Sequence, residues 1–166
     1  MSEIEPPENP QHSVDYPGDP RHPEHDLFIT ALGEATYMAA RLAGICFDIL
    51  RVFDRQISAS LYPDPLGTLQ RKVAELARNS ETPPPRLLDF AARLAEAVMT
   101  RNDLTHALPV KDGLLRHRGN VRIEFYSVES VQEVTARLDA TWRLGSEILY
   151  HDGGASIEAW YRDGGS

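Results

Sequence analysis

Residues 101–106, with the sequence RNDLTH, bring an arginine, an asparagine and a histidine into less than two helical turns. Such side chains suit chemistry on anions, because a guanidinium binds two phosphate or carboxylate oxygens at once and an imidazole moves protons near neutral pH. Asn102 and His106 are four residues apart, so they share one face of a helix. Arg101 and His106 lie about 140° apart around a straight helix, so one helix does not readily bring both to the same atom.

Arg101 continues the apolar stripe of a predicted helix. This helix is expected to begin near Pro85 or Arg86 and to run to about His106. Arg101 follows Leu94 by seven residues, so it lies on the line that faces the core or a partner. An unpaired buried guanidinium is costly, so it must meet a carboxylate, a helix C-terminus, a subunit interface or an anionic ligand. A second copy of the helix, antiparallel across a two-fold axis, would place the histidine of one chain beside the arginine of the other.

Two further amphipathic helices are predicted before this one, from apolar residues at three- and four-residue spacing. The first runs from about Asp26 to Asp54 and includes Cys46, which we interpret as a core residue because it is the single cysteine and fits no metal spacing. The second has Asp64 as its N-cap and Pro65 at its first helical position.

A short β insert and a fourth helix follow the RNDLTH helix. Asp112 and Gly113 are typical of a tight hairpin turn, and residues 121–126 alternate apolar and polar side chains. The fourth helix begins at Ser127 or at Ser130, where the second choice would form a capping box. The predicted fold is all-α, a four-helix bundle with a short β-hairpin insert between the third and fourth helices.

The 166 residues suffice for one domain, and their charges are unevenly distributed. We expect a disordered, acidic, proline-rich tail at 1–24, the bundle at 25–152 and a glycine-containing tail at 153–166. The overall net charge is −8, yet a net charge of +3 falls within residues 111–122. This basic segment suits contact with phosphates or, equally, a solvated charged hairpin.

Several function classes are disfavoured by the motifs that the sequence lacks. It has no glycine-rich phosphate loop, no H-E-x-x-H and no G-x-S-x-G, which argues against a Rossmann enzyme or a zinc hydrolase. We see neither a signal peptide nor an apolar stretch of membrane-spanning length, so we expect a cytoplasmic protein without a membrane partner.

The arginine, the polar residue directly after it and the histidine at the end of a helix resemble the R-x(4–6)-H signature of the HEPN superfamily. Arg101, Asn102 and His106 are the matching positions. The PLGTLQRKVAEL helix, the proline break, the β insert and the final helix are also similar to bacterial HEPN proteins, so the resemblance covers about residues 26–150.

The resemblance implies a homodimeric, metal-independent endoribonuclease without a cofactor, often a toxin or an anti-phage effector. In that reading His106 transfers protons, Arg101 binds the scissile phosphate and Asn102 orients the histidine or binds a phosphate oxygen. The basic segment supplies RNA-backbone contacts. Its four cations are Lys111, Arg116, Arg118 and Arg122.

Two alternatives remain open at this stage. The same helix end in a catalytically silent HEPN-like dimer would serve a protein-interaction module, and an Arg101–carboxylate pair within the chain is its expected mark. Partners other than RNA and a second copy, such as an antitoxin or a regulatory protein, are also left open, and no DNA partner is predicted. HEPN toxins paired with a nucleotidyltransferase antitoxin often carry a tyrosine where this chain has Leu108, so that mode of control is not expected.

Overall fold

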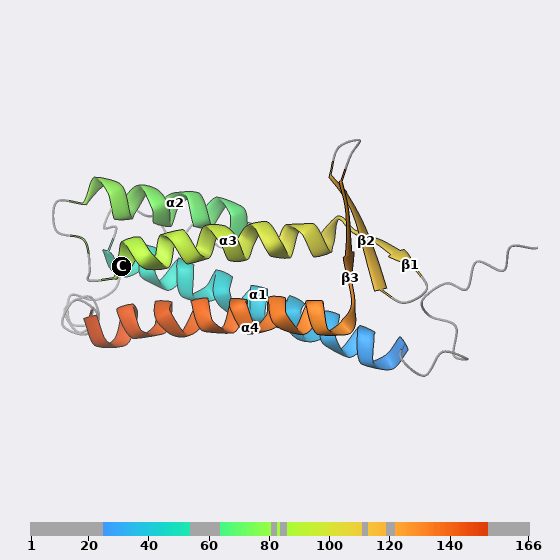
Figure 1. Cartoon of the computed structure of the whole chain (residues 1–166). Helices are drawn as coiled ribbons and strands as arrows, with labels where there is room; N and C mark the ends of the chain where they lie inside the picture. Colours follow the sequence, from blue (N-terminus) through green and yellow to red (C-terminus); the bar gives the residue numbers. More distant parts are fainter. Residues whose placement is uncertain are drawn as a thin grey trace, which may run out of the picture.

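Four α-helices lie along one another and a small sheet stands at one end of them in the computed structural model (Figure 1). The predicted four-helix bundle with a β insert between the third and fourth helices is therefore confirmed. The structure describes residues 25–53, 64–80, 83, 86–110, 113–118 and 122–152. The tails expected at 1–24 and 153–166 lie outside these residues.

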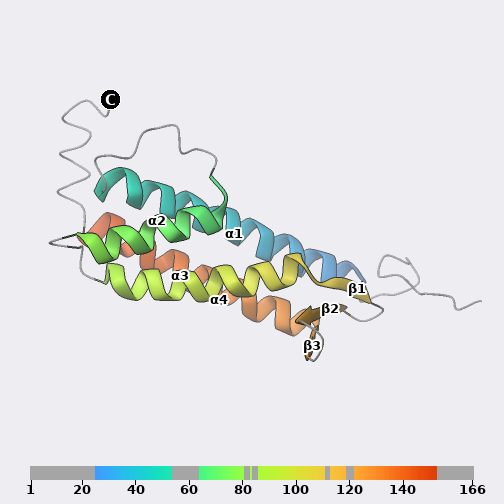
Figure 2. The ribbon, with the colours of Figure 1, turned by 90° about the horizontal axis from the view of Figure 1, so that it is seen from above.

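Each helix packs against two others, which closes the bundle: α1 against α2 and α4, and α3 against α2 and α4 (Figure 2). A π-helical turn, Ile148–Asp152, extends α4. The helices are α1 His25–Phe53, α2 Leu66–Asn79, α3 Leu87–Thr105 and α4 Val128–Glu147.

The core forms because each helix has an inward face on which apolar residues recur at three- and four-residue spacing and pack together. Cys46 is fully enclosed, as predicted, and burial raises the pKa of its thiol well above the usual range. The largest fully buried side chains are Phe90, Leu42, Ile49, Leu50, Leu87, Leu94, Leu138 and Ile148.

The start of α2 differs from the prediction by one residue. Pro65 is the N-cap, with an extended ψ of 146°, and Asp64 makes no capping hydrogen bond. The Asp64 carboxylate instead lies 2.8 Å from the Lys72 ammonium, so it pairs with a cation further along the helix.

The start of α4 follows the first of the two predicted alternatives. Ser127 is the N-cap, and its Oγ accepts a hydrogen bond from the Ser130 N–H at 3.3 Å. Ser127 Oγ also donates to Glu129 at 2.7 Å, and this hydrogen bond lowers the pKa of the Glu129 carboxyl.

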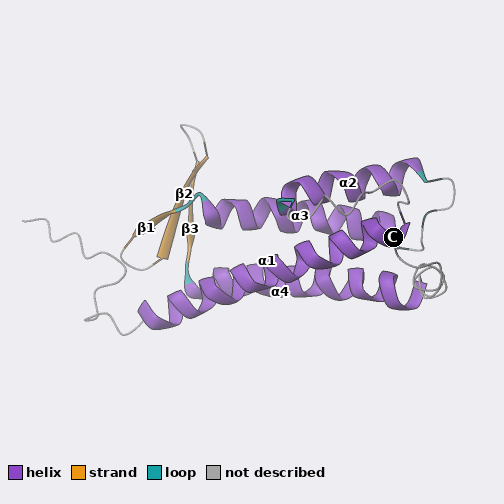
Figure 3. Ribbon diagram, turned by 180° about the vertical axis from the view of Figure 1, so that it is seen from behind, coloured by secondary structure: helices purple, strands orange, loops and turns teal. Residues whose placement is uncertain are grey.

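The β insert forms an antiparallel sheet of three strands in the order β1-β2-β3, one strand more than a hairpin (Figure 3). The additional strand, β1, starts directly after the end of α3 and holds Pro109 at the sheet edge, where a missing N–H is tolerated. The strands are β1 Leu108–Val110, β2 Gly113–Arg118 and β3 Arg122–Tyr126.

The predicted turn at Asp112-Gly113 is wrong by one residue. Gly113 belongs to β2 and pairs with Val110, so residues 111 and 112 link the strands, outside the described part. A Cβ at Gly113 would meet the Tyr126 carbonyl oxygen and would lie 2.8 Å from Phe125 Cζ. The glycine therefore allows a close approach between β2 and β3 and does not serve as a turn residue.

Candidate functional site at the end of α3

Arg101, Asn102 and His106 occupy the last turn and the C-cap of α3. The helix stops at Thr105, and His106 has φ −102° and ψ 5°. Its N–H still donates to the Asn102 carbonyl oxygen at 3.0 Å, so the backbone of this turn is fixed before the chain enters β1.

The Arg101 guanidinium is half-buried and turned toward its neighbour. Its Nη1 donates to Asn102 Oδ1 at 3.2 Å, and it forms no ion pair with a carboxylate among the described residues. Because Asn102 shares a face with His106, this hydrogen bond brings the arginine round toward the histidine side of the helix.

The His106 side chain is exposed, and its imidazole has no hydrogen bond or ion pair within the described part of the chain. Thr105, beside it, is different, because its hydroxyl donates to the Arg101 carbonyl oxygen at 2.9 Å. The threonine hydroxyl is thus hydrogen-bonded within its own helix, whereas the exposed His106 side chain has no such bond to the described residues.

An exposed apolar stripe runs along α3 and ends at the motif. We call Leu88, Ala92, Ala95 and Met99 the outer stripe; with Asn102 and His106 these residues repeat at three- and four-residue spacing. Leu88 is 59% exposed and Met99 is 54% exposed. Exposed apolar side chains in line with polar ones are typical of an interaction surface.

A buried acid, Asp103, lies inside the motif and was not singled out by sequence reasoning. Its exposed fraction is 7%, and its Oδ1 lies 3.5 Å from the Arg116 Nε. Arg116 Nη1 also donates to the His106 carbonyl oxygen at 3.2 Å. The sequence signal was an acid in an amphipathic helix just before four cations, but the spacing does not tell which cation meets it.

Of the four predicted RNA contacts, only Arg116 is shown beside the motif. Lys111 lies outside the described residues. Arg118 and Arg122 are partners in the register of β2 and β3, and the structure describes the backbone of these two residues but not their side chains. The RNA-binding role of these residues stays a prediction.

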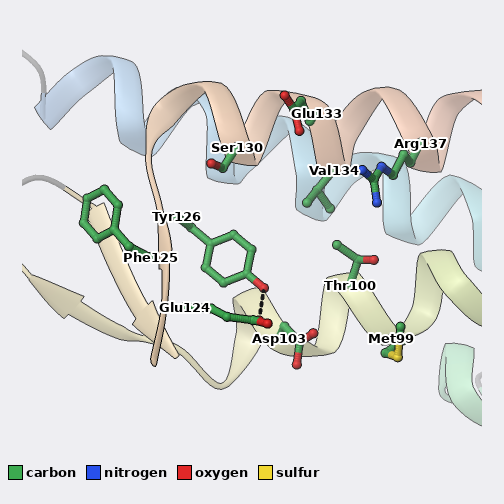
Figure 4. Close-up of a pocket in the computed structure, with 10 residues that line it drawn as sticks. All are labelled: Met99, Thr100, Asp103, Glu124, Phe125, Tyr126, Ser130, Glu133, Val134 and Arg137. Atoms are coloured by element: carbon green, nitrogen blue, oxygen red, sulfur yellow. Dashed lines mark hydrogen bonds between the residues drawn. The ribbon is translucent and has the colours of Figure 1, made fainter. Parts of the chain in front are cut away.

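A pocket of about 400 Å³ lies on another side of α3, between this helix, β3 and α4 (Figure 4). Tyr126 reaches across it, and its hydroxyl donates to Glu124 at 3.1 Å. The lining contains three acids and one arginine and none of the three motif residues, so phosphate chemistry fits the helix end better than the pocket. The charged lining residues are Asp103, Glu124, Glu133 and Arg137.

Compared with protein-family models, curated proteins and solved structures, the chain matches none. Across the described ranges, no three His, Cys, Asp or Glu side chains gather as a metal site would require. Among the helices described, none combines the length and the apolar character needed to cross a bilayer.

Proposed function

We propose that the protein is a HEPN-type endoribonuclease that acts as a homodimer on RNA in the cytoplasm, as a toxin or an anti-phage effector. The observation that carries the proposal is the exposed His106 imidazole, which follows Asn102 by one turn, while the Asn102 side chain holds the Arg101 guanidinium at 3.2 Å. Cleavage of a phosphodiester uses a proton-transfer group and an anion-binding group, which are the roles that we assign to His106 and Arg101.

The chemistry follows from the substrate's own 2′-hydroxyl. One His106 takes the proton of the 2′-hydroxyl while the 2′ oxygen attacks the phosphorus. The O2′–P bond forms and the P–O5′ bond breaks. The His106 of the second copy gives a proton to the leaving 5′ oxygen, and the products carry a 2′,3′-cyclic phosphate and a 5′-hydroxyl. Arg101 stabilises the charge that builds on the non-bridging oxygens, in bidentate fashion.

The position of the two-fold axis decides whether such a site can form. An antiparallel pairing along the outer stripe together with the motif, from Leu88 to His106, has its centre between Ala95 and Met99. It would separate the two His106 residues by about 27 Å along the axis, at 1.5 Å per residue. A crossing at the motif itself brings the two histidines together. It would also cover Met99 and Leu108, which flank the motif and are 54% and 62% exposed.

The decisive test is cleavage of total bacterial RNA by the purified protein in EDTA. We expect wild type to leave 2′,3′-cyclic phosphate ends, and His106→Ala or Arg101→Ala to lose about 10²–10⁴-fold in rate. His117→Ala is the matched control, because His117 is an exposed histidine on the neighbouring strand β2 and should keep full activity. Equal cleavage by all variants would contradict the motif assignment.

A second candidate, the silent interaction module, is favoured by one observation, the exposed outer stripe of α3. Its expected mark, an Arg101–carboxylate pair, is not found within the described residues. Folded, dimeric wild type that leaves RNA intact would favour the module, with an antitoxin or a regulatory protein as its partner.

A further inference from the structure

We propose that Arg116 is a positioning residue that fixes His106 at the end of α3, and that its guanidinium faces Asp103 and the helix end and does not contact RNA. The catalytic part of this inference rests on the proposed ribonuclease function. The positioning itself can be tested without any activity.

The Arg116 guanidinium is engaged on two sides. Nη1 donates to the His106 carbonyl oxygen at 3.2 Å, and Nε lies 3.5 Å from the Asp103 carboxylate. The Arg116 side chain is 27% exposed and that of Asp103 is 10% exposed. A cation that already neutralises a buried carboxylate is poorly placed to bind a phosphate, since separating the pair would be costly.

The contact with His106 acts at the point where α3 lacks hydrogen-bond donors. The last carbonyl groups of a helix have no partner within the helix, and the negative end of the helix dipole favours a cation there. His106 is the C-cap, so the direction of its carbonyl and the direction of its side chain are set by the same φ and ψ. Holding the carbonyl therefore fixes the direction in which the Cα–Cβ bond leaves the helix end, and with it the point from which the imidazole projects.

Strand β2 presents Arg116 to the helix because its side chains alternate. Leu114, two residues earlier, is buried, whereas His117, the next residue, is exposed. In the register Arg116 pairs with Glu124, and both Glu124 and Asp103 line the pocket between α3, β3 and α4 (Figure 4). The sheet thus connects to the motif through the inner face of β2.

Asp103 draws the guanidinium inward mainly by its charge. The Arg116 Nε atom is enclosed and has no hydrogen-bond partner among the described residues, so the carboxylate at 3.5 Å acts on it electrostatically. Asp103→Asn removes this charge but leaves the bond from Arg116 to the His106 carbonyl possible. Arg116→Gln removes that bond.

The experiment compares these two variants with wild type and with Arg116→Lys. Ring signals of His106 are followed by ¹H–¹³C correlation NMR of histidine-labelled protein, kcat and KM are measured on RNA, and urea unfolding reports stability. For Arg116→Gln we expect shifted His106 ring signals and a kcat lower by about tenfold or more, with KM within about twofold of wild type. Asp103→Asn should be destabilised to a similar extent yet change the ring signals and kcat less, and Arg116→Lys should recover part of kcat.

A raised KM with unchanged kcat and unchanged His106 signals would overturn the inference, because it would make Arg116 an RNA contact. Equal changes in the His106 ring signals and in kcat for Asp103→Asn and Arg116→Gln would also overturn the inference. They would mean that the Asp103–Arg116 pair acts only by stabilising the fold. If Arg116→Gln does not fold, the His106 ring signals and kcat of Arg116→Lys are compared with those of Asp103→Asn instead. If wild type does not cleave RNA, the proposed function fails, whereas the ring signals still decide the positioning.

Discussion

The two halves of α3 differ in the side chains that they bury. From Leu87 to Val98 its inward side is apolar and closed, with Phe90 and Leu94 fully buried. From Arg101 to His106 the helix holds a half-buried guanidinium and a buried carboxylate that meets a second arginine from the sheet, next to the buried Leu104. The first half is stabilised by apolar packing, whereas the second half also buries polar side chains that contact the sheet.

This difference separates the part of α3 that is stabilised by apolar packing from the part that carries the candidate site. In α4, the buried polar side chain Thr141 donates to its own helix, to the Arg137 carbonyl oxygen at 2.8 Å. In the polar half, contacts join α3 to β2 across the fold. A buried ion pair between distant residues stabilises a fold less than apolar packing of the same volume does. We therefore interpret the polar half of α3 as serving the candidate site and not stability.

The largest effect is expected in the apolar half. Phe90→Ala removes a fully buried ring and leaves a cavity between α3 and α4, so the free energy of unfolding should fall by about 3–5 kcal/mol. Urea denaturation measures this. Leu88→Ala, on the exposed side of the same helix, is the control and should change stability by less than about 1 kcal/mol. Similar losses in both variants would remove the distinction between the two sides of α3.

In the polar half, pairing should matter more than either charge alone. Arg116→Leu leaves the buried Asp103 carboxylate without its arginine, and we expect a loss of about 2–3 kcal/mol in the free energy of unfolding. The double variant Asp103→Leu/Arg116→Leu should be more stable than Arg116→Leu, as a double-mutant cycle in urea would show. Simple additivity of the two single losses would contradict the coupling.

A smaller effect is expected where α4 approaches α3. A Cβ at Gly145 would lie 2.8 Å from Phe90 Cε2, so Gly145→Ala overpacks a site in which the ring cannot leave the core. Part of this loss is offset by the better helix propensity of alanine, and a net loss of about 1 kcal/mol is expected from thermal unfolding. Gly33→Ala in α1 meets no atom within 4 Å and should instead stabilise the protein. A stabilising Gly145→Ala would show that the contact is loose.

The smallest effect concerns Asp48 on α1, outside α3. Burial raises the pKa of its carboxyl, and the nearby Arg51 lowers it to a lesser degree. A raised pKa in the folded state means that the ionised form disfavours folding, so stability is lost as the pH rises through that pKa. Asp48→Asn should therefore raise Tm slightly at pH 7. This gain in Tm should shrink at low pH, where the Asp48 carboxyl is protonated and carries no charge. A gain that is independent of pH would point to another cause.

Much of the fold could be predicted from local periodicity. Apolar spacing predicted the four helices, the core position of Cys46 and the end of the third helix at His106, because each depends on residues within a few turns. Periodicity also predicted a β insert after Pro109, although it did not predict that β1 would join the sheet as a third strand.

The contacts across the fold could not be predicted in the same way. Gly113 looked like a turn residue because glycine permits turns, yet its role depends on Phe125 and Tyr126 in a strand that only tertiary structure brings close. The pairing of Asp103 with Arg116 has the same character, since spacing alone does not choose among four cations in one segment. The predicted motif residues, by contrast, lie at one helix end because of their spacing in the sequence, and among their side chains the described contact is the one from Arg101 to Asn102.

The burial of the single cysteine has a practical consequence for labelling chemistry. Cys46 is enclosed in the core and its thiol resists ionisation, so maleimides and spin labels should leave the native protein unmodified. A cysteine introduced at the exposed Met99 would therefore be the one reactive thiol in each chain. In the homodimer that we propose, distances between two such labels would report directly where α3 of one copy crosses α3 of the other.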